Sequence, residues 1–100
     1  FAQTIKKVTE GDKLTISLEG RLDTSTAPEL ESVVNESIDE VTELTFDLEK
    51  MSYVSSAGLR VFLGAQKKMQ TKGKMVVINV QDSVTDIFEV TGFSDILDIQ

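Results

Sequence analysis

The sequence lacks several residues on which enzyme and metal chemistry depend. Its 100 residues contain no cysteine, no histidine and no tryptophan. Without cysteine the chain forms no disulfide framework and no thiolate metal site, and without histidine it cannot assemble a Ser-His-Asp triad. No GxGxxG or GxxxxGKS/T segment supplies a dinucleotide or P-loop signature. We therefore expect that the protein is not an enzyme and that it holds no cofactor and no metal.

Long hydrophobic runs are also missing. No apolar segment approaches the roughly 20 residues needed to cross a bilayer, and no secretory signal pattern opens the chain. We expect a cytoplasmic protein with no direct membrane insertion, built as a single domain over residues 1–100, because this length is typical of one domain. Because the sequence begins at Phe1 and not at Met, upstream residues and a fusion to another segment stay open.

The charges are unevenly distributed. The formal net charge of −7 disfavours nucleic acid as a partner. Residues 22–49 contain nine acids and no bases, residues 50–81 contain six bases and no acids, and residues 82–100 contain five acids and no bases. Chance and solvated helix faces would explain this division. The alternative is a local field in the basic block that tolerates an added anion or docks an acidic partner surface.

Hydrophobic periodicity predicts alternating strands and helices. Apolar and polar residues alternate over 13–19, as in a half-buried strand, and apolar residues follow helical spacing over 27–40. The element order β-β-α-β-α-β-α-α predicts an α/β fold with parallel pairing through right-handed crossovers and an antiparallel first strand at an edge. The predicted strands span 5–8, 13–19, 44–48 and 74–80, the predicted helices span 27–40, 56–72 and 82–91, and 94–99 is expected to form a helical turn or a short strand.

The predicted helix ends carry capping signals. Ser25 or Thr26 is expected to cap the first helix and Asp82 or Ser83 the third, because short polar side chains bond the free N–H groups of a first turn. The glycines predicted to end the second and third helices are Gly73 and Gly92.

Two adjacent serines, Ser55 and Ser56, stand at the predicted start of the second helix, inside the basic block. A helix N-terminus carries about half a positive charge, so it accepts a capping hydroxyl and stabilises a phosphate more strongly. Phosphorylation would add a charge of roughly −1.5 to −2, which the helix tolerates and an acidic or apolar partner surface does not. The position therefore fits a switch that changes binding and keeps the fold. In the alternative interpretation, one serine caps the helix and the other is a neutral neighbour.

Two segments resemble one protein family. The stretches TFDLEKMSYVSSAGLRVFL and GRLDTSTAPEL are similar to the signature segments of STAS domains, in spacing as well as in residues. The resemblance implies a four-stranded sheet with helices packed against it. It also implies the role of an anti-sigma factor antagonist: the unphosphorylated protein binds an anti-sigma factor that is also a serine kinase, which releases the sigma factor. Phosphorylation by that kinase breaks the complex, and a serine phosphatase resets it.

The resemblance also implies site residues. It places the phosphorylated residue at Ser56, with Ser55, where many members carry aspartate, as the alternative. Asp23 resembles a polar residue near the partner-binding face of the family, and a turn residue that bonds local N–H groups is the alternative. Ala57 and Gly58 are small and would let another surface approach closely. The partner-binding residues implied are Asp23, Thr24, Ser25, Ser55, Ser56, Ala57, Gly58, Leu59 and Arg60.

Two other functions stay open at this point. STAS-like domains also serve as soluble subunits of lipid-transport ABC complexes and in other regulatory scaffolds. A module that binds its partner without being switched is the second alternative, and it predicts that binding is indifferent to phosphate at Ser56.

Overall fold

The strands form one mixed sheet in the order β1-β2-β3-β4, which confirms the predicted α/β fold. The structure is a computed structural model and describes residues 4–100. β1 pairs antiparallel with β2 at one edge, while β2, β3 and β4 run parallel, as predicted. The elements are β1 (Thr4–Glu10), β2 (Lys13–Leu22), α1 (Ala27–Ser37), η1 (Ile38–Glu40), β3 (Glu43–Val54), α2 (Ser56–Gln70), β4 (Lys74–Ile78), α3 (Asp82–Val90) and η2 (Phe93–Asp95).

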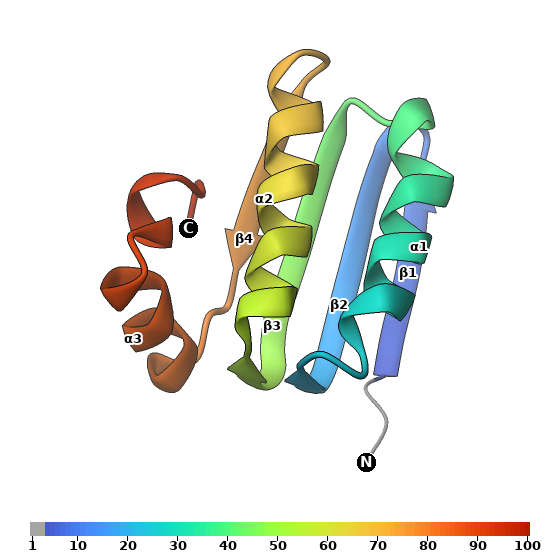
Figure 1. Ribbon diagram of the computed structural model, residues 1–100. Helices are drawn as coiled ribbons and strands as arrows, with labels where there is room; N and C mark the ends of the chain where they lie inside the picture. Colours follow the sequence, from blue (N-terminus) through green and yellow to red (C-terminus); the bar gives the residue numbers. More distant parts are fainter. Residues whose placement is uncertain (1–3) are drawn as a thin grey trace.

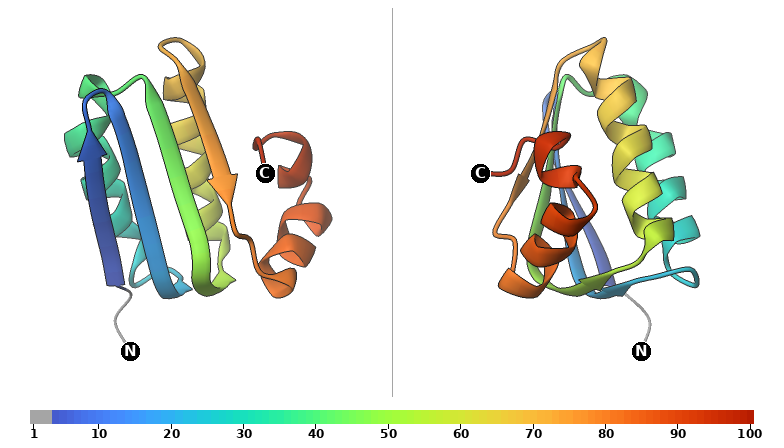
Figure 2. Two further views of the ribbon diagram at one scale, coloured as in Figure 1. Left: turned by 180° about the vertical axis from the view of Figure 1, so that it is seen from behind. Right: turned by 60° about the vertical axis from the view of Figure 1, so that its left-hand side comes forward.

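Helices cover one face of the sheet and leave the other open. In Figure 1, α1 and α2 lie side by side in front of the strands, and the turned view in Figure 2 places both on the same side of the sheet. α3 lies beside the β4 edge and is bonded to the last part of β3. The Ser83 hydroxyl donates to the Ser52 carbonyl at 3.3 Å, and the Gln81 amide donates to the Glu49 carbonyl at 2.7 Å. Along β2 and β3, the residues that alternate with the buried ones face the open side.

The core lies between the sheet and its helices. Phe62 of α2 packs edge-to-face against Phe46 of β3 and Phe88 of α3, with ring centroids 5.0 Å and 6.2 Å apart. All three rings are fully buried. Each such pair adds about 0.5–1.5 kcal/mol beyond the burial of its area. The rings therefore fix α2 against both the sheet and α3.

β3 is longer than the predicted strand 44–48. It continues to Val54 because its pairing with β2 shifts twice, between Ser17 and Glu19 and again between Gly20 and Arg21. Each shift inserts an extra residue into β3, so its buried positions change from a spacing of two to a spacing of three. The strict alternation of buried and exposed residues, on which the predicted strand depended, stops at the first bulge, although the strand does not.

The helix extents are close to the prediction. The first helix continues to Glu40 as predicted, but its last turn is the tighter η1. α2 ends at Gln70 instead of Lys72, where Gly73 N–H donates to the Met69 carbonyl at 2.8 Å. The segment 94–99 begins with the predicted helical turn, η2, and does not form a strand, since only Ile99 makes a single bridge to Val77 of β4. None of the helices described within residues 4–100 is long and apolar enough to cross a membrane.

The predicted side-chain caps of the first and third helices are wrong. Thr26 occupies the N-cap position of α1, but its hydroxyl makes no capping bond and bonds instead within the preceding loop. α3 begins after Gln81 without a side-chain cap, because Asp82 and Ser83 already lie inside the helix. The Ser83 hydroxyl is used for the contact with β3.

The glycines that follow α2 and α3 are required for different physical reasons. Gly92 ends α3 with a φ of 81°, the left-handed conformation expected at a helix C-terminus. Gly73 follows α2 because a Cβ there would lie 1.8 Å from the carbonyl oxygen of Thr42. This second position needs glycine for close packing of two loops, not for its backbone angle.

Candidate functional site

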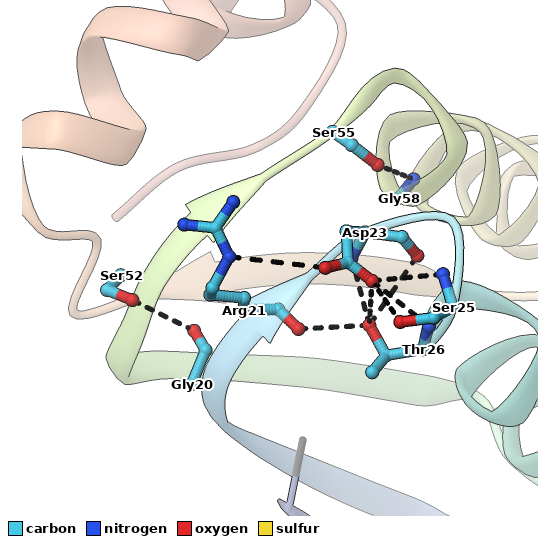
Figure 3. Close-up of polar contacts among 8 residues, drawn as sticks. All are labelled: Gly20, Arg21, Asp23, Ser25, Thr26, Ser52, Ser55 and Gly58. Carbon is cyan, nitrogen blue, oxygen red and sulfur yellow. Dashed lines mark hydrogen bonds and ion pairs between the residues drawn. The ribbon is translucent and has the colours of Figure 1, made fainter. Parts of the chain in front are cut away.

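The two family-like segments meet at one end of the sheet. β2 ends at Leu22 and β3 ends at Val54, and these two residues are partners in the parallel ladder. Just beyond them, Ser55 N–H donates to the Leu22 carbonyl at 2.8 Å. Figure 3 shows the resulting cluster, in which the loop before α1 and the start of α2 lie next to each other. The carboxyl ends of parallel strands are the usual place for sites in α/β folds.

The two serines have separate roles in the structure. Ser55 is the N-cap of α2, with extended backbone, and its hydroxyl accepts from Gly58 N–H at 3.4 Å. Ser56 is the first residue of the helix and is exposed. Within the described part of the chain, the Ser56 hydroxyl makes no hydrogen bond to protein. The capping role therefore belongs to Ser55, and the Ser56 hydroxyl is left available.

Asp23 organises the loop before α1. Its carboxylate accepts from Ser25 N–H at 3.0 Å, from the Ser25 hydroxyl at 2.7 Å and from Thr26 N–H at 3.3 Å. These bonds, the one from the Ser25 hydroxyl first among them, lower the pKa of Asp23 from its usual value of 3.8. The interpretation of Asp23 as a turn residue that bonds local N–H groups is thus confirmed.

Thr26 locks the same loop from the inside. Its buried hydroxyl accepts from Asp23 N–H at 2.9 Å and donates to the Arg21 carbonyl at 2.9 Å. The loop is therefore held by bonds among its own residues, and each hydroxyl except that of exposed Thr24 has a partner in it.

A stacked pair, Arg21 on Tyr53, was not predicted from the sequence. The second bulge places Arg21 opposite Tyr53, and the Arg21 Cζ lies 4.3 Å from the centre of the Tyr53 ring. The Arg21 side chain is 61% exposed and lies 4.0 Å from the Asp23 carboxylate. A single base that precedes a long acidic block was a signal in the sequence, but its aromatic partner depends on the register of the bulge.

Comparison with known proteins shows the family of the chain. A model described as the STAS domain matches residues 3–100. The chain belongs to the STAS domain family. An anti-sigma-B factor antagonist of Listeria monocytogenes is 34% identical over 96 residues, covering 94% of this chain and 84% of the relative.

Solved structures agree in fold. An anti-sigma factor antagonist from Mycobacterium paratuberculosis gives a TM-score of 0.88 at 20% identity, over 98% of this chain and 85% of that one. The Bacillus cell fate determinant SpoIIAA in its phosphorylated form gives a TM-score of 0.75 at 19% identity, over 99% of this chain and 91% of that one. The four-stranded sheet with packed helices that the resemblance implied is confirmed.

Within this STAS domain, the residues named from the family do not all face outward. Gly58 is buried, and a Cβ there would lie 2.7 Å from the Leu22 side chain and 2.8 Å from that of Val54. Its small size serves the approach of α2 to the sheet, so the expectation that it admits another surface is wrong. Leu59 is only 6% exposed and belongs to the core. The residues left at the surface are Thr24, Ser25, Ser56 and Arg60, which are exposed, and Asp23, Ser55 and Ala57, which are half-buried.

The exposed and half-buried side chains around Ser56 come from the loop before α1 and from the start of α2. A hollow of about 220 Å³ lies elsewhere, on the open sheet face, and is lined by strand residues of mixed charge that include Lys6, Glu19 and Asp47. Across residues 4–100, no three acidic side chains converge as a metal site.

Proposed function

We propose that this STAS domain is an anti-sigma factor antagonist that binds an anti-sigma factor while Ser56 is unmodified and is inactivated by phosphorylation of Ser56. The observation that carries the proposal is the division of labour at the start of α2, where Ser55 caps the helix and the exposed Ser56 hydroxyl has no structural bond among the described residues. The 34% identical Listeria relative, an anti-sigma-B factor antagonist, supports the same role.

The proposed docking surface combines the loop before α1 with the start of α2. It consists of the exposed and half-buried residues of the cluster, with Gly58 and Leu59 acting beneath it as packing residues. The loop of Asp23 is rigid because of its internal bonds, so a partner binds it with little loss of conformational entropy. Asp23 and Arg60 supply one charge of each sign on this surface.

Phosphate on Ser56 changes that surface without unfolding it. It adds a charge of roughly −1.5 to −2 at the positive end of α2, where the first-turn N–H groups and the helix dipole stabilise it. Residues 50–81 contain no acid that would repel it along the chain. A protein of the same fold has been solved in a phosphorylated form, which supports the compatibility of the fold with a phosphate.

The remaining parts of the proposal concern the partners. The anti-sigma factor is proposed to be the serine kinase that modifies Ser56, and a serine phosphatase restores the binding form. This STAS domain is then a substrate of the kinase and not itself an enzyme. The proposal places it in the cytoplasm, because sigma factors act on the transcription machinery there.

Site-resolved phosphopeptide mass spectrometry tests the proposal directly. The protein is isolated from its own cells in growth and in stress, and the occupancy of Ser55 and Ser56 is measured separately. Phosphate on Ser56 that changes with condition is the expected result. Phosphate only on Ser55 contradicts the assigned acceptor. No phosphate in any condition contradicts the switch and favours the transport subunit or the unswitched scaffold.

A further inference from the structure

Arg60 lies one helical turn after Ser56 on α2. Residues four apart on a helix are neighbours, with Cβ atoms about 5–6 Å from each other. Both side chains are exposed, whereas Gly58 and Leu59 between them are buried. A group attached to the Ser56 oxygen therefore extends over the same outward face that carries Arg60.

Arg60 has no competing acidic partner along its helix. α2 contains no aspartate or glutamate, and within residues 4–100 Arg60 takes part in none of the ion pairs or side-chain hydrogen bonds. The other arginine of the region, Arg21, is already engaged because it stacks on Tyr53. The guanidinium of Arg60 is thus a free set of donors beside the proposed acceptor.

We propose that Arg60 binds the phosphomonoester formed on Ser56. The anion precedes the cation by four residues, which is the favourable order for an ion pair on a helix. Guanidinium and phosphate also match in geometry, because two parallel N–H groups meet two oxygens. The biological meaning of this pairing rests on the proposed function, but the pairing itself does not depend on any partner.

The pairing adds a second effect to the switch. Arg60 belongs to the proposed docking surface while Ser56 is unmodified. When the phosphate binds Arg60, the surface gains negative charge and loses a cation in the same event. A partner carboxylate that had been paired with Arg60 then faces a phosphate instead.

The test measures proton binding by the phosphate itself. Phosphoserine is incorporated at position 56 of the full chain during synthesis, and the second ionisation of the phosphate is followed by ³¹P NMR. Arg60→Gln is expected to raise the proton affinity of the phosphate about twofold, because the neighbouring cation no longer favours the dianion. Arg60→Lys retains part of the effect, since it keeps the charge and loses the fork. Asp23 on the adjacent loop is present in all variants, so its influence cancels.

Two controls separate pairing from general charge. Arg21→Gln removes an equal charge from a side chain that is already stacked on Tyr53. This variant should leave the proton affinity of the phosphate unchanged. Arg60→Gln combined with Gly64→Arg restores the net charge one turn further on, at an exposed position where an added Cβ meets nothing within 4 Å. This double variant should behave like Arg60→Gln, because the cation has moved four residues, about 6 Å, along the axis.

Two results would overturn the proposal. One is a phosphate at position 56 that has the same proton affinity in Arg60→Gln as in the parent. The other is a proton affinity that the Arg60→Gln, Gly64→Arg double variant restores fully to the parent value. Neither result bears on whether Ser56 is phosphorylated in cells. Conversely, Ser56 could be unmodified in cells while Arg60→Gln still changes the proton affinity of the phosphate in the synthetic phosphoprotein. That combination would contradict the proposed function and support the pairing of Arg60 with the phosphate.

Discussion

Two helix starts in this STAS domain use similar residues in opposite ways. Both α1 and α2 follow a parallel strand, cover the same face of the sheet and are preceded by hydroxyl side chains. Before α1, Thr26 turns its hydroxyl back to the end of β2, and Asp23 uses its carboxylate to hold the loop. Before α2, Ser55 makes the capping bond and Ser56 is left exposed. A hydroxyl at a helix start is therefore available for function only when another residue makes the structural bonds there.

The largest expected effect is on the packing beneath the second helix start. Gly58→Val places a branched side chain where Leu22 and Val54 already lie within 3 Å of the Cβ position. Overpacking of this kind costs about 1–3 kcal/mol, so we expect the Tm to fall by at least about 4 °C. The measurement is thermal unfolding followed by circular dichroism.

Gly64→Val is the matched control for that variant. It lies on the same helix, is exposed and has open space at the Cβ position. Its Tm should stay near that of the parent. Equal Tm values for the two valine variants would show that the contact of Gly58 with the sheet does not limit stability.

At the first helix start, the loop depends on one buried hydroxyl. Thr26→Val removes the partner of Asp23 N–H and of the Arg21 carbonyl while it keeps the shape of the side chain. Leaving such groups without a partner costs about 1–3 kcal/mol, measured as a loss of unfolding free energy in urea. Thr26→Ser retains the hydroxyl and should lose less than half as much. If the serine variant is no more stable than the valine variant, the hydrogen bonds are not what stabilises the loop.

The sequence could predict the elements and the direction of their pairing, but not the detailed register of the strands. The element order, and the position of Ser55 and Ser56 at the start of α2, follow from local patterns. The antiparallel edge strand follows from the order of the elements. The bulges in β3 do not, since an extra residue in one strand has meaning only against the register of β2. The pair of Arg21 and Tyr53 depends on that register and was missed for the same reason.

The roles of individual polar residues were harder to predict from the sequence than the strand register. Capping requires the helix boundary to the exact residue, and sequence patterns place a boundary only to within a few residues. A shift of one position decides whether Ser55 or Ser56 is the cap. The burial of Gly58 is also not encoded locally, because it depends on the close approach of α2 to Leu22 and Val54.

After the two stability effects at Gly58 and Thr26, the next largest expected effect is on the affinity for the partner. Ser56→Asp puts a negative charge on the proposed docking surface, and we expect it to weaken binding of the proposed anti-sigma factor partner at least tenfold, or about 1.4 kcal/mol, in calorimetry. The Tm should hardly change, because Ser56 has no structural bond among the described residues. Ser32→Asp adds the same charge to an exposed position of α1 and should leave the affinity unaltered. Similar partner affinities for the two aspartate variants would show that Ser56 does not belong to the binding surface.

The serine pair itself gives a smaller difference in stability. Ser55→Ala removes the bond to Gly58 N–H and should cost about 1 kcal/mol, whereas Ser56→Ala should stay within about 0.5 kcal/mol of the parent. Chemical denaturation of both single variants under one condition gives the comparison. The opposite order would mean that the cap has been assigned to the wrong serine.

The smallest effect concerns the charge that holds the first loop. Hydrogen bonds from Ser25 and Thr26 keep the pKa of Asp23 below its usual value of 3.8, so the folded state favours the carboxylate. This contribution to stability is fully present above the unfolded-state pKa and is lost as the pH falls through the lowered folded-state pKa. The Tm difference between the parent and Asp23→Asn should therefore be constant near neutral pH and should shrink below about pH 4. Ser25→Ala removes the hydroxyl bond that contributes most, so this variant should show a weaker acid dependence than the parent. A Tm difference that stays constant down to about pH 2 would mean that the carboxylate gains nothing from the loop that it organises.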